Sequence, residues 1–151
     1  MQKLNNEEEI NLKKIAVTIR KHVLRMIKAG GSGHIGGALS CTDILTALYF
    51  KIMKVDPKNP DWPERDRFVL SAGHKCLALY GTLAAKGFFE ESLLDTYGAL
   101  CTKLGGHPDM HKLPGVESNT GALGHGLSIA GGMAMGLRMD RFDSKVYVML
   151  G

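Results

Sequence analysis

The sequence predicts an α/β fold in which parallel strands alternate with helices. Two short apolar runs, 67–70 and 145–150, are typical of buried strands. Helical patterns separate the two runs, so the strands form a right-handed crossover unit rather than a closed sheet. Buried parallel strands need neighbours on both sides. We therefore expect residues 1–151 to be an incomplete part of a doubly wound parallel-sheet domain, truncated after its second strand.

The first third of the chain is predicted to be helical. Apolar residues recur at helical spacing over about 6–29, and Gly30-Gly31 are expected to end this helix. Ser40-Cys-Thr-Asp43 resembles a capping box, which predicts a second helix from there to about Lys54. The segment 56–63 is a turn-rich connector, because its three prolines forbid regular pairing.

The rest of the chain holds further helices and one long loop. An apolar helix should follow the first strand and run to about Lys86, and a short helix should cover 90–99. The stretch 101–120 shows no periodicity and is interpreted as a loop, which at this length is usually functional. A helix over 125–140 is rich in small residues, which favours close approach to another element at about 1 kcal/mol per interior glycine.

Composition excludes several classes of function. With 44% hydrophobic and 23% charged residues the chain is ordinary for a soluble globular domain. The net charge of +4 is scattered, so we expect no nucleic-acid partner. No apolar run reaches the roughly 18 residues of a spanning helix, and no signal peptide is evident, so no membrane partner is expected. Cys41, Cys76 and Cys101 are interpreted as reduced, buried thiols, which predicts a cytoplasmic location.

Four glycine–histidine pairs are the most informative feature of the sequence. They are Gly33-His34, Gly73-His74, Gly106-His107 and Gly124-His125, each in a loop or at the end of an element. Imidazole suits the handling of substrate hydroxyls and oxyanions near neutral pH, and glycine lets a ligand come close. We expect one shared polar pocket; the alternative is turn glycines beside structural histidines. His22, within the first helix, is interpreted as part of its polar surface.

Three weaker motifs also have plainer explanations. The segment 31–36 matches GxGxxG, but a helix precedes it where a dinucleotide site needs a strand. His107 and His111 have zinc-motif spacing, but Pro108 interrupts the helix that such a motif needs, so no metal site is expected and His111 is assigned to the surface. The turn 121–126 feeds a helix whose free N–H groups would suit a phosphate, although it could serve tight packing alone.

Taken in order, these motifs resemble the N-terminal, diphosphate-binding part of transketolases, most closely the split form in which this part is a separate subunit. The similarity runs from about residue 10 to the end of the chain. The segments that carry it are 30–37, 70–74, 105–108 and 120–126. The resemblance implies a thiamine-diphosphate-binding domain and the transfer of a two-carbon ketol unit from a ketose phosphate to an aldose phosphate.

The resemblance also implies roles for single residues. His34 would contact the substrate's carbonyl and hydroxyl oxygens and assist proton transfer, and His74 would contact the diphosphate. His107 would contact the donor's first hydroxyl and the substrate while it is bound to the cofactor. The catalytic residues implied are thus His34 and His107, and the cofactor-binding residues are His74, His107, Gly121, Leu123 and Gly151.

Partners and a metal follow from the same resemblance. Gly151 stands where the family's Gly-Asp-Gly metal motif begins, so the ligands of Mg²⁺ are expected beyond residue 151 and none within it. The implied partners are sugar-phosphate substrates and a C-terminal transketolase subunit, in a dimer or heterotetramer. This chain alone is expected to be inactive. Two alternatives stay open: a component of another thiamine-diphosphate enzyme, and an inactive truncated scaffold.

Overall fold

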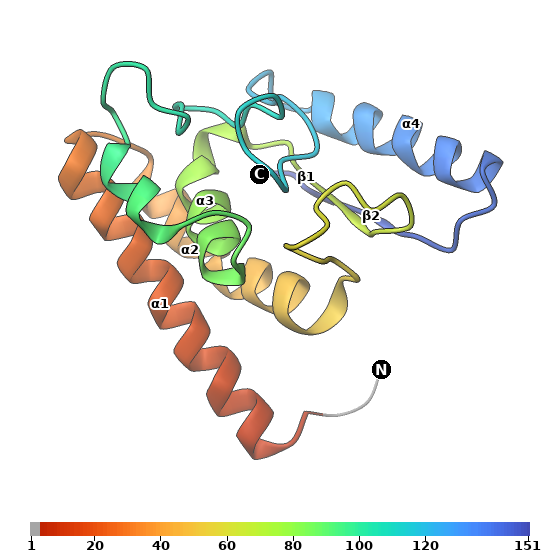
Figure 1. Ribbon diagram of the computed structural model, residues 1–151, viewed down its shortest axis with the longest axis horizontal. Coiled ribbons are helices and arrows are strands. Elements are labelled where there is room, and N and C mark those ends of the chain that lie inside the picture. Colours follow the sequence, from red (N-terminus) through yellow and green to blue (C-terminus); the bar gives the residue numbers. More distant parts are fainter. Residues whose placement is uncertain (1–3) are drawn as a thin grey trace.

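A pair of parallel strands lies between two layers of helices (Figure 1). The computed structural model describes residues 4–151. Strand β1 (Arg67–Leu70) pairs with β2 (Val146–Met149), with Arg67 opposite Val146. On one side lies α4, and on the other lie α1, α2 and α3, which confirms the predicted α/β class. The helical elements are α1 (Asn6–Gly30), α2 (Ile35–Ala47), the π-helical turn η1 (Leu48–Ile52), the 3₁₀ turn η2 (Gly73–Lys75), α3 (Cys76–Lys86), the 3₁₀ helix η3 (Glu91–Thr96) and α4 (His125–Met139).

Helix α1 begins and ends where its sequence predicts. At its start the Asn5 side chain accepts from the Glu8 N–H (2.8 Å), and Glu8 accepts from the Asn5 N–H (3.1 Å), which completes a capping box. At its end Gly31 adopts a left-handed conformation (φ 68°), and its N–H donates to Ile27 O. The buried face of the helix carries Ala16, Ile19, His22, Val23 and Met26.

The assignment of His22 to the polar surface is wrong. This side chain is buried, and its Nδ1 lies 3.1 Å from Gly81 O, so that Nδ1 must carry the hydrogen and donate. Glycine at position 81 of α3 makes the close approach possible, because a Cβ there would lie 3.2 Å from His22 Cβ. The partner is remote in sequence, so the pattern of α1 alone does not reveal the burial.

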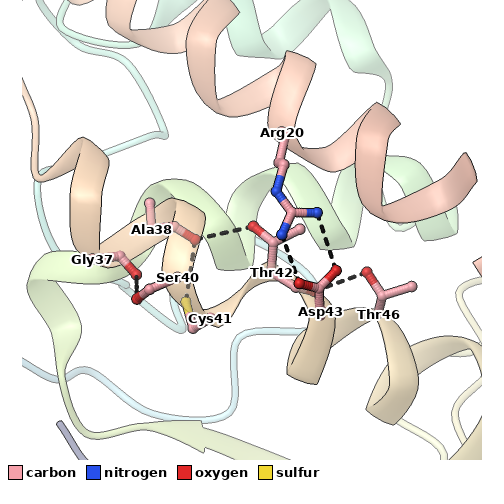
Figure 2. A network of polar contacts seen from close by, with 8 residues as sticks. All are labelled: Arg20, Gly37, Ala38, Ser40, Cys41, Thr42, Asp43 and Thr46. Atoms are coloured by element: carbon pink, nitrogen blue, oxygen red, sulfur yellow. Dashed lines mark hydrogen bonds and ion pairs between the residues drawn. The ribbon is translucent and has the colours of Figure 1, made fainter. Parts of the chain in front are cut away.

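Helix α2 begins at Ile35, and the capping box predicted at Ser40–Asp43 is wrong. Figure 2 shows that the Ser40 hydroxyl donates to Gly37 O (2.9 Å) within the helix. Asp43 instead accepts two hydrogen bonds from Arg20 of α1, at 3.1 and 2.6 Å. Arg20 and Asp43 therefore tie α2 to α1, and neither Ser40 nor Asp43 caps the start of a helix.

A segment long and apolar enough to cross a membrane, by length and composition alone, covers Ile35–Ile52. The segment has 18 residues and a mean hydropathy of 1.2. The expectation that no apolar run reaches this length is therefore wrong. The buried residues of this segment pack in the core between α1 and α3: Ala38, Cys41, Leu45 and Tyr49. Core packing therefore accounts for the apolar character of this face.

The core centres on α3, and burial decreases toward the C-terminus. Every residue from 76 to 84 is buried, as are the last three residues of β1. In contrast, β2 is only half-buried, and α4 exposes Leu127, Met135 and Met139. The loop predicted at 101–120 is present, but the prediction of three buried thiols is wrong for Cys101, which is exposed.

Candidate functional site

Three of the four paired histidines gather at the carboxyl end of β1. His34 immediately precedes α2, and His74 lies in η2 directly after β1; their ring centroids are 5.0 Å apart. His107 comes from the long loop, and Gly121 lies against its ring, since a Cβ there would be 3.2 Å from His107 Cδ2. His125 lies in the first turn of α4, where it lines a pocket together with Thr120 and Gly121.

The electrostatic setting lowers the pKa of His74 and so favours its neutral form. Partial burial lowers its pKa most, and the positive charges of His34, Lys75 and His107 lower it further. A neutral imidazole has one N–H donor and one acceptor nitrogen, so His74 can donate a hydrogen bond without carrying a charge.

Glycines allow the segments that carry the histidines to pack closely. At Gly33 the backbone is left-handed (φ 145°), and a Cβ would lie 2.8 Å from side chains of both Ile27 and Leu77. At Gly73 a Cβ would lie 2.8 Å from Thr120 Oγ1, so glycine lets the end of the long loop pack on the end of β1. Gly33 and Gly73 thus serve packing, as the plainer interpretation expects, whereas a Cβ at Gly106 or Gly124 would meet no atom within 4 Å.

The loop that carries His107 is held by two side chains one turn apart on α3. The Tyr80 hydroxyl lies 2.9 Å from both Gly105 O and His107 O, and its proton is shared between them. The Cys76 thiol donates to Gly106 O at 3.2 Å, and burial raises the pKa of this thiol to about 12, so it stays protonated at neutral pH. Sequence reasoning missed both side chains, because an apolar helix pattern carries no sign of contacts with a distant loop.

A pocket of about 210 Å³ opens beside these residues, between the end of the long loop and the start of α4. Its lining residues are Asn119, Thr120, Gly121, Ala122, His125, Gly126 and Ile129. The Thr120 hydroxyl oxygen is buried and has no hydrogen-bond partner within residues 4–151. A buried polar atom without a partner is costly, so this hydroxyl is available to bond a group that enters the pocket.

The amides at the start of α4 are already bonded, contrary to the expected free phosphate cradle. The N–H of His125 donates to Ala122 O (3.3 Å), and that of Leu127 donates to Gly124 O (3.2 Å). The N–H of Gly126 donates to the Ser71 hydroxyl at 3.2 Å, across from the end of β1. An anion at this site must therefore find its donors mainly on side chains.

Two predicted site residues remain, Leu123 and Gly151, and Gly151 lies on the rim of the site, which is the set of residues that follow β1 and β2. Leu123 precedes α4 and is 63% exposed, a large fraction for leucine. Gly151 lies beside Lys75, with the position of a Cβ there close to Lys75 Nζ and 3.6 Å from Ala72 Cβ. Sequence reasoning also missed Lys75, although it directly follows one of the glycine–histidine pairs.

The side chains fit an anionic, hydrogen-bonding ligand better than a metal. In the part of the chain that the structure describes, no three His, Cys, Asp or Glu side chains are grouped to hold a metal ion. Imidazoles, one lysine and an unpartnered hydroxyl instead supply donors suited to phosphate oxygens. The residues present therefore fit the diphosphate end of the implied cofactor, and they provide no ligand set for Mg²⁺.

Comparison with known proteins decides the family. Residues 11–151 match the family model described as transketolase, thiamine diphosphate binding domain. The chain belongs to the transketolase family. A 6-deoxy-6-sulfo-D-fructose transketolase subunit from a Clostridium species is 48% identical over 97% of this chain and 53% of its own length. One of the apulose-4-phosphate transketolase subunits of Phocaeicola vulgatus is 52% identical over 87% of this chain and 47% of its own.

Solved transketolases share the fold as well. The enzyme of Leishmania mexicana superposes with a TM-score of 0.86 at 31% identity, and that of Campylobacter jejuni with 0.85 at 37%. Each alignment covers 93% of this chain, but only 22% and 23% of those longer chains. The chain thus spans about half the length of the curated relatives named above and less than a quarter of these transketolases.

Proposed function

We propose that this chain is the diphosphate-binding part of a two-subunit transketolase that moves a two-carbon ketol unit between sugar phosphates. The main support is the meeting of three imidazoles from distant segments, with the His34 and His74 rings 5.0 Å apart, at the carboxyl end of β1. Open α/β sheets bind their ligands at this end of the strands. The membership in the transketolase family supplies the reaction class.

The proposed roles follow from the chemistry of the side chains. When bound, thiamine diphosphate would supply the nucleophilic carbon and the electron sink for cleavage of the ketose. His34 would accept a proton from a substrate hydroxyl and return it, and His107 would hydrogen-bond the donor's first hydroxyl. Neutral His74 would donate to a diphosphate oxygen, while Gly121 and Leu123 would lie against the cofactor.

The rest of the assembly is proposed on the resemblance. Gly151 would lie near the diphosphate, and residues beyond it would hold Mg²⁺. A C-terminal subunit would complete the site, in a dimer or heterotetramer located in the cytoplasm. This chain alone would bind the cofactor weakly and transfer no ketol unit.

Reconstitution with the C-terminal subunit of a two-subunit transketolase tests the proposal. Ketose phosphate cleavage is measured with thiamine diphosphate and Mg²⁺, and cofactor affinity is measured by calorimetry. His34→Ala should lower turnover at nearly unchanged cofactor affinity. His74→Ala should weaken binding of the cofactor roughly ten- to a hundredfold, since a hydrogen bond to a charged group contributes about 1.5–3 kcal/mol. The control is His111→Ala, at an exposed position of the same long loop.

The outcomes separate the alternatives. Turnover of 2-oxo acids in place of sugar phosphates would assign the chain to another thiamine-diphosphate enzyme. Absence of cofactor binding by the complete assembly would leave the scaffold, and the proposal would be wrong. Full cofactor affinity in His74→Ala would remove that residue from the diphosphate site.

A further inference from the structure

Lys75 is a cation at the rim of the candidate site, and within residues 4–151 its charge has no ion-pair partner. It is half-buried, directly after His74, in the turn between β1 and α3. The ion pairs formed within residues 4–151 do not include Lys75, and none of the side-chain hydrogen bonds there involves its ammonium group. A half-buried lysine without a carboxylate beside it is well placed to bind an anion, because a buried charge is costly unless it is paired.

The stem of Lys75 is held in position by two glycines from opposite sides of the rim. A Cβ at Gly37 of α2 would lie 3.1 Å from Lys75 Cγ and 3.3 Å from its Cε. The ammonium group lies next to Gly151, just after β2. Only positions without side chains leave room for this extended lysine, which therefore carries its charge across the rim toward the end of β2.

The charge of Lys75 acts on the site. It lowers the pKa of His74, after the larger effects of burial and His34. It also opposes the rise that burial causes in the pKa of the Cys41 thiol of α2. The field of this lysine thus reaches the same space in which the His34 and His74 rings meet.

The other possible source of anion binding is already committed. The first amides of α4 donate to Ala122 O, Gly124 O and the Ser71 hydroxyl. Neutral His74 supplies a hydrogen bond but no charge. Among the side chains of this rim, Lys75 is consequently the group best able to neutralise a bound phosphate.

We propose that Lys75 binds a phosphate-type oxyanion held beside His34 and His74. This inference rests on the proposed function, which supplies two sources of that chemistry: the diphosphate of the cofactor and the phosphate of the sugar substrate. Lys75 is then a binding residue that adds charge to the hydrogen bonds of the imidazoles. An ammonium–phosphate contact is a charge-assisted hydrogen bond and weakens with salt.

The first experiment measures binding of inorganic diphosphate to the chain by calorimetry. Lys75→Met removes the charge at similar length and should weaken binding about tenfold, which corresponds to about 1.4 kcal/mol. It should also reduce the dependence of the affinity on salt. Lys75→Arg should stay within about threefold of the native affinity. Lys58→Met is the matched control: Lys58 is exposed in the connector that precedes β1, at the opposite end of the strand.

The second experiment uses the complex reconstituted with the C-terminal subunit and identifies the source of the oxyanion. A weaker affinity for thiamine diphosphate assigns Lys75 to the cofactor. A raised KM for a phosphorylated acceptor, with an unphosphorylated acceptor unaffected, assigns it to the substrate.

Three results would overturn the proposal. The first is that Lys75→Met binds inorganic diphosphate, thiamine diphosphate and the phosphorylated acceptor as tightly as the native protein does. The second is that Lys58→Met loses as much affinity as Lys75→Met. The third is that Lys75→Met has a lowered unfolding midpoint without any loss of affinity. Ketol transfer by the native complex combined with any of these would refute the role of Lys75 alone. Suppose instead that Lys75→Met loses diphosphate binding while the native complex transfers no ketol unit. That result would refute the proposed function alone.

Discussion

Gly126 lies where α4 touches the end of β1, and adding one methyl group there should separate the two elements. A Cβ at Gly126 would lie 2.7 Å from both Cα and Oγ of Ser71, and closer still to its Cβ. Ser71 is buried directly after the strand and cannot swing away. Overpacking of this kind costs about 1–3 kcal/mol, and contact with backbone places Gly126→Ala at about 3 kcal/mol. The same shift would break the hydrogen bond from the Gly126 N–H to Ser71.

The same helix offers its own control. A Cβ at Gly131 would meet no atom within 4 Å, so Gly131→Ala should gain helix propensity, up to about 1 kcal/mol. Urea unfolding of the chain, followed by far-ultraviolet circular dichroism, gives both free energies of unfolding. We expect opposite signs and a gap of about 3–4 kcal/mol between the two free energies of unfolding, at equal m-values. Equal stability of Gly126→Ala and the native chain, or an equal loss in Gly131→Ala, would refute this account of the contact.

Two other predictions concern how the histidines are held and charged. Tyr80→Phe leaves carbonyl groups of the long loop without their donor, so it should lower the free energy of unfolding by about 1–3 kcal/mol. Because this loop carries His107, the same change should weaken binding of inorganic diphosphate. Thr82→Val, which removes another buried hydroxyl of α3, should change stability alone, and equal diphosphate affinities of all three proteins would contradict this role. In an NMR titration of the histidines, the pKa of His74 should lie below 6.5, the ordinary value. Folding favours the neutral form of this ring, so its contribution to stability is present above pH 6.5 and is lost as the pH falls through the pKa of the folded state. Lys75→Met should raise the pKa of His74, and an unchanged titration would show that the lysine charge does not reach the ring.

Local sequence signals predicted the elements whose ends depend on neighbouring residues. The left-handed Gly31 ends α1, and the apolar run at β1 is buried, because each depends on a few adjacent residues. The predicted start of the second helix was wrong for the converse reason. Ser40 has the composition of a cap, but its hydroxyl bonds within α2, and Asp43 pairs with Arg20, more than twenty residues earlier. A capping pattern does not show which partner its side chains will find.

The candidate site likewise has residues that the sequence could indicate and residues that it could not. Glycine–histidine pairs could be recognised because they recur, and the structure brings His34, His74 and His107 together. The groups that hold and charge them could not be recognised. Tyr80 reaches the loop only after α3 has packed beneath it, and Lys75 resembles any surface lysine until Gly37 and Gly151 enclose its stem.

The arrangement of these supports explains why the site depends on the whole domain. His34 is carried by the start of α2, which Arg20 and Asp43 tie to α1. His74 follows β1, and the loop of His107 is bonded to α3. No single element presents two of the three imidazoles, so their separation reflects the packing of both strand and helix layers. A fragment that retained each motif but lost this packing would keep every site residue and still lose the site.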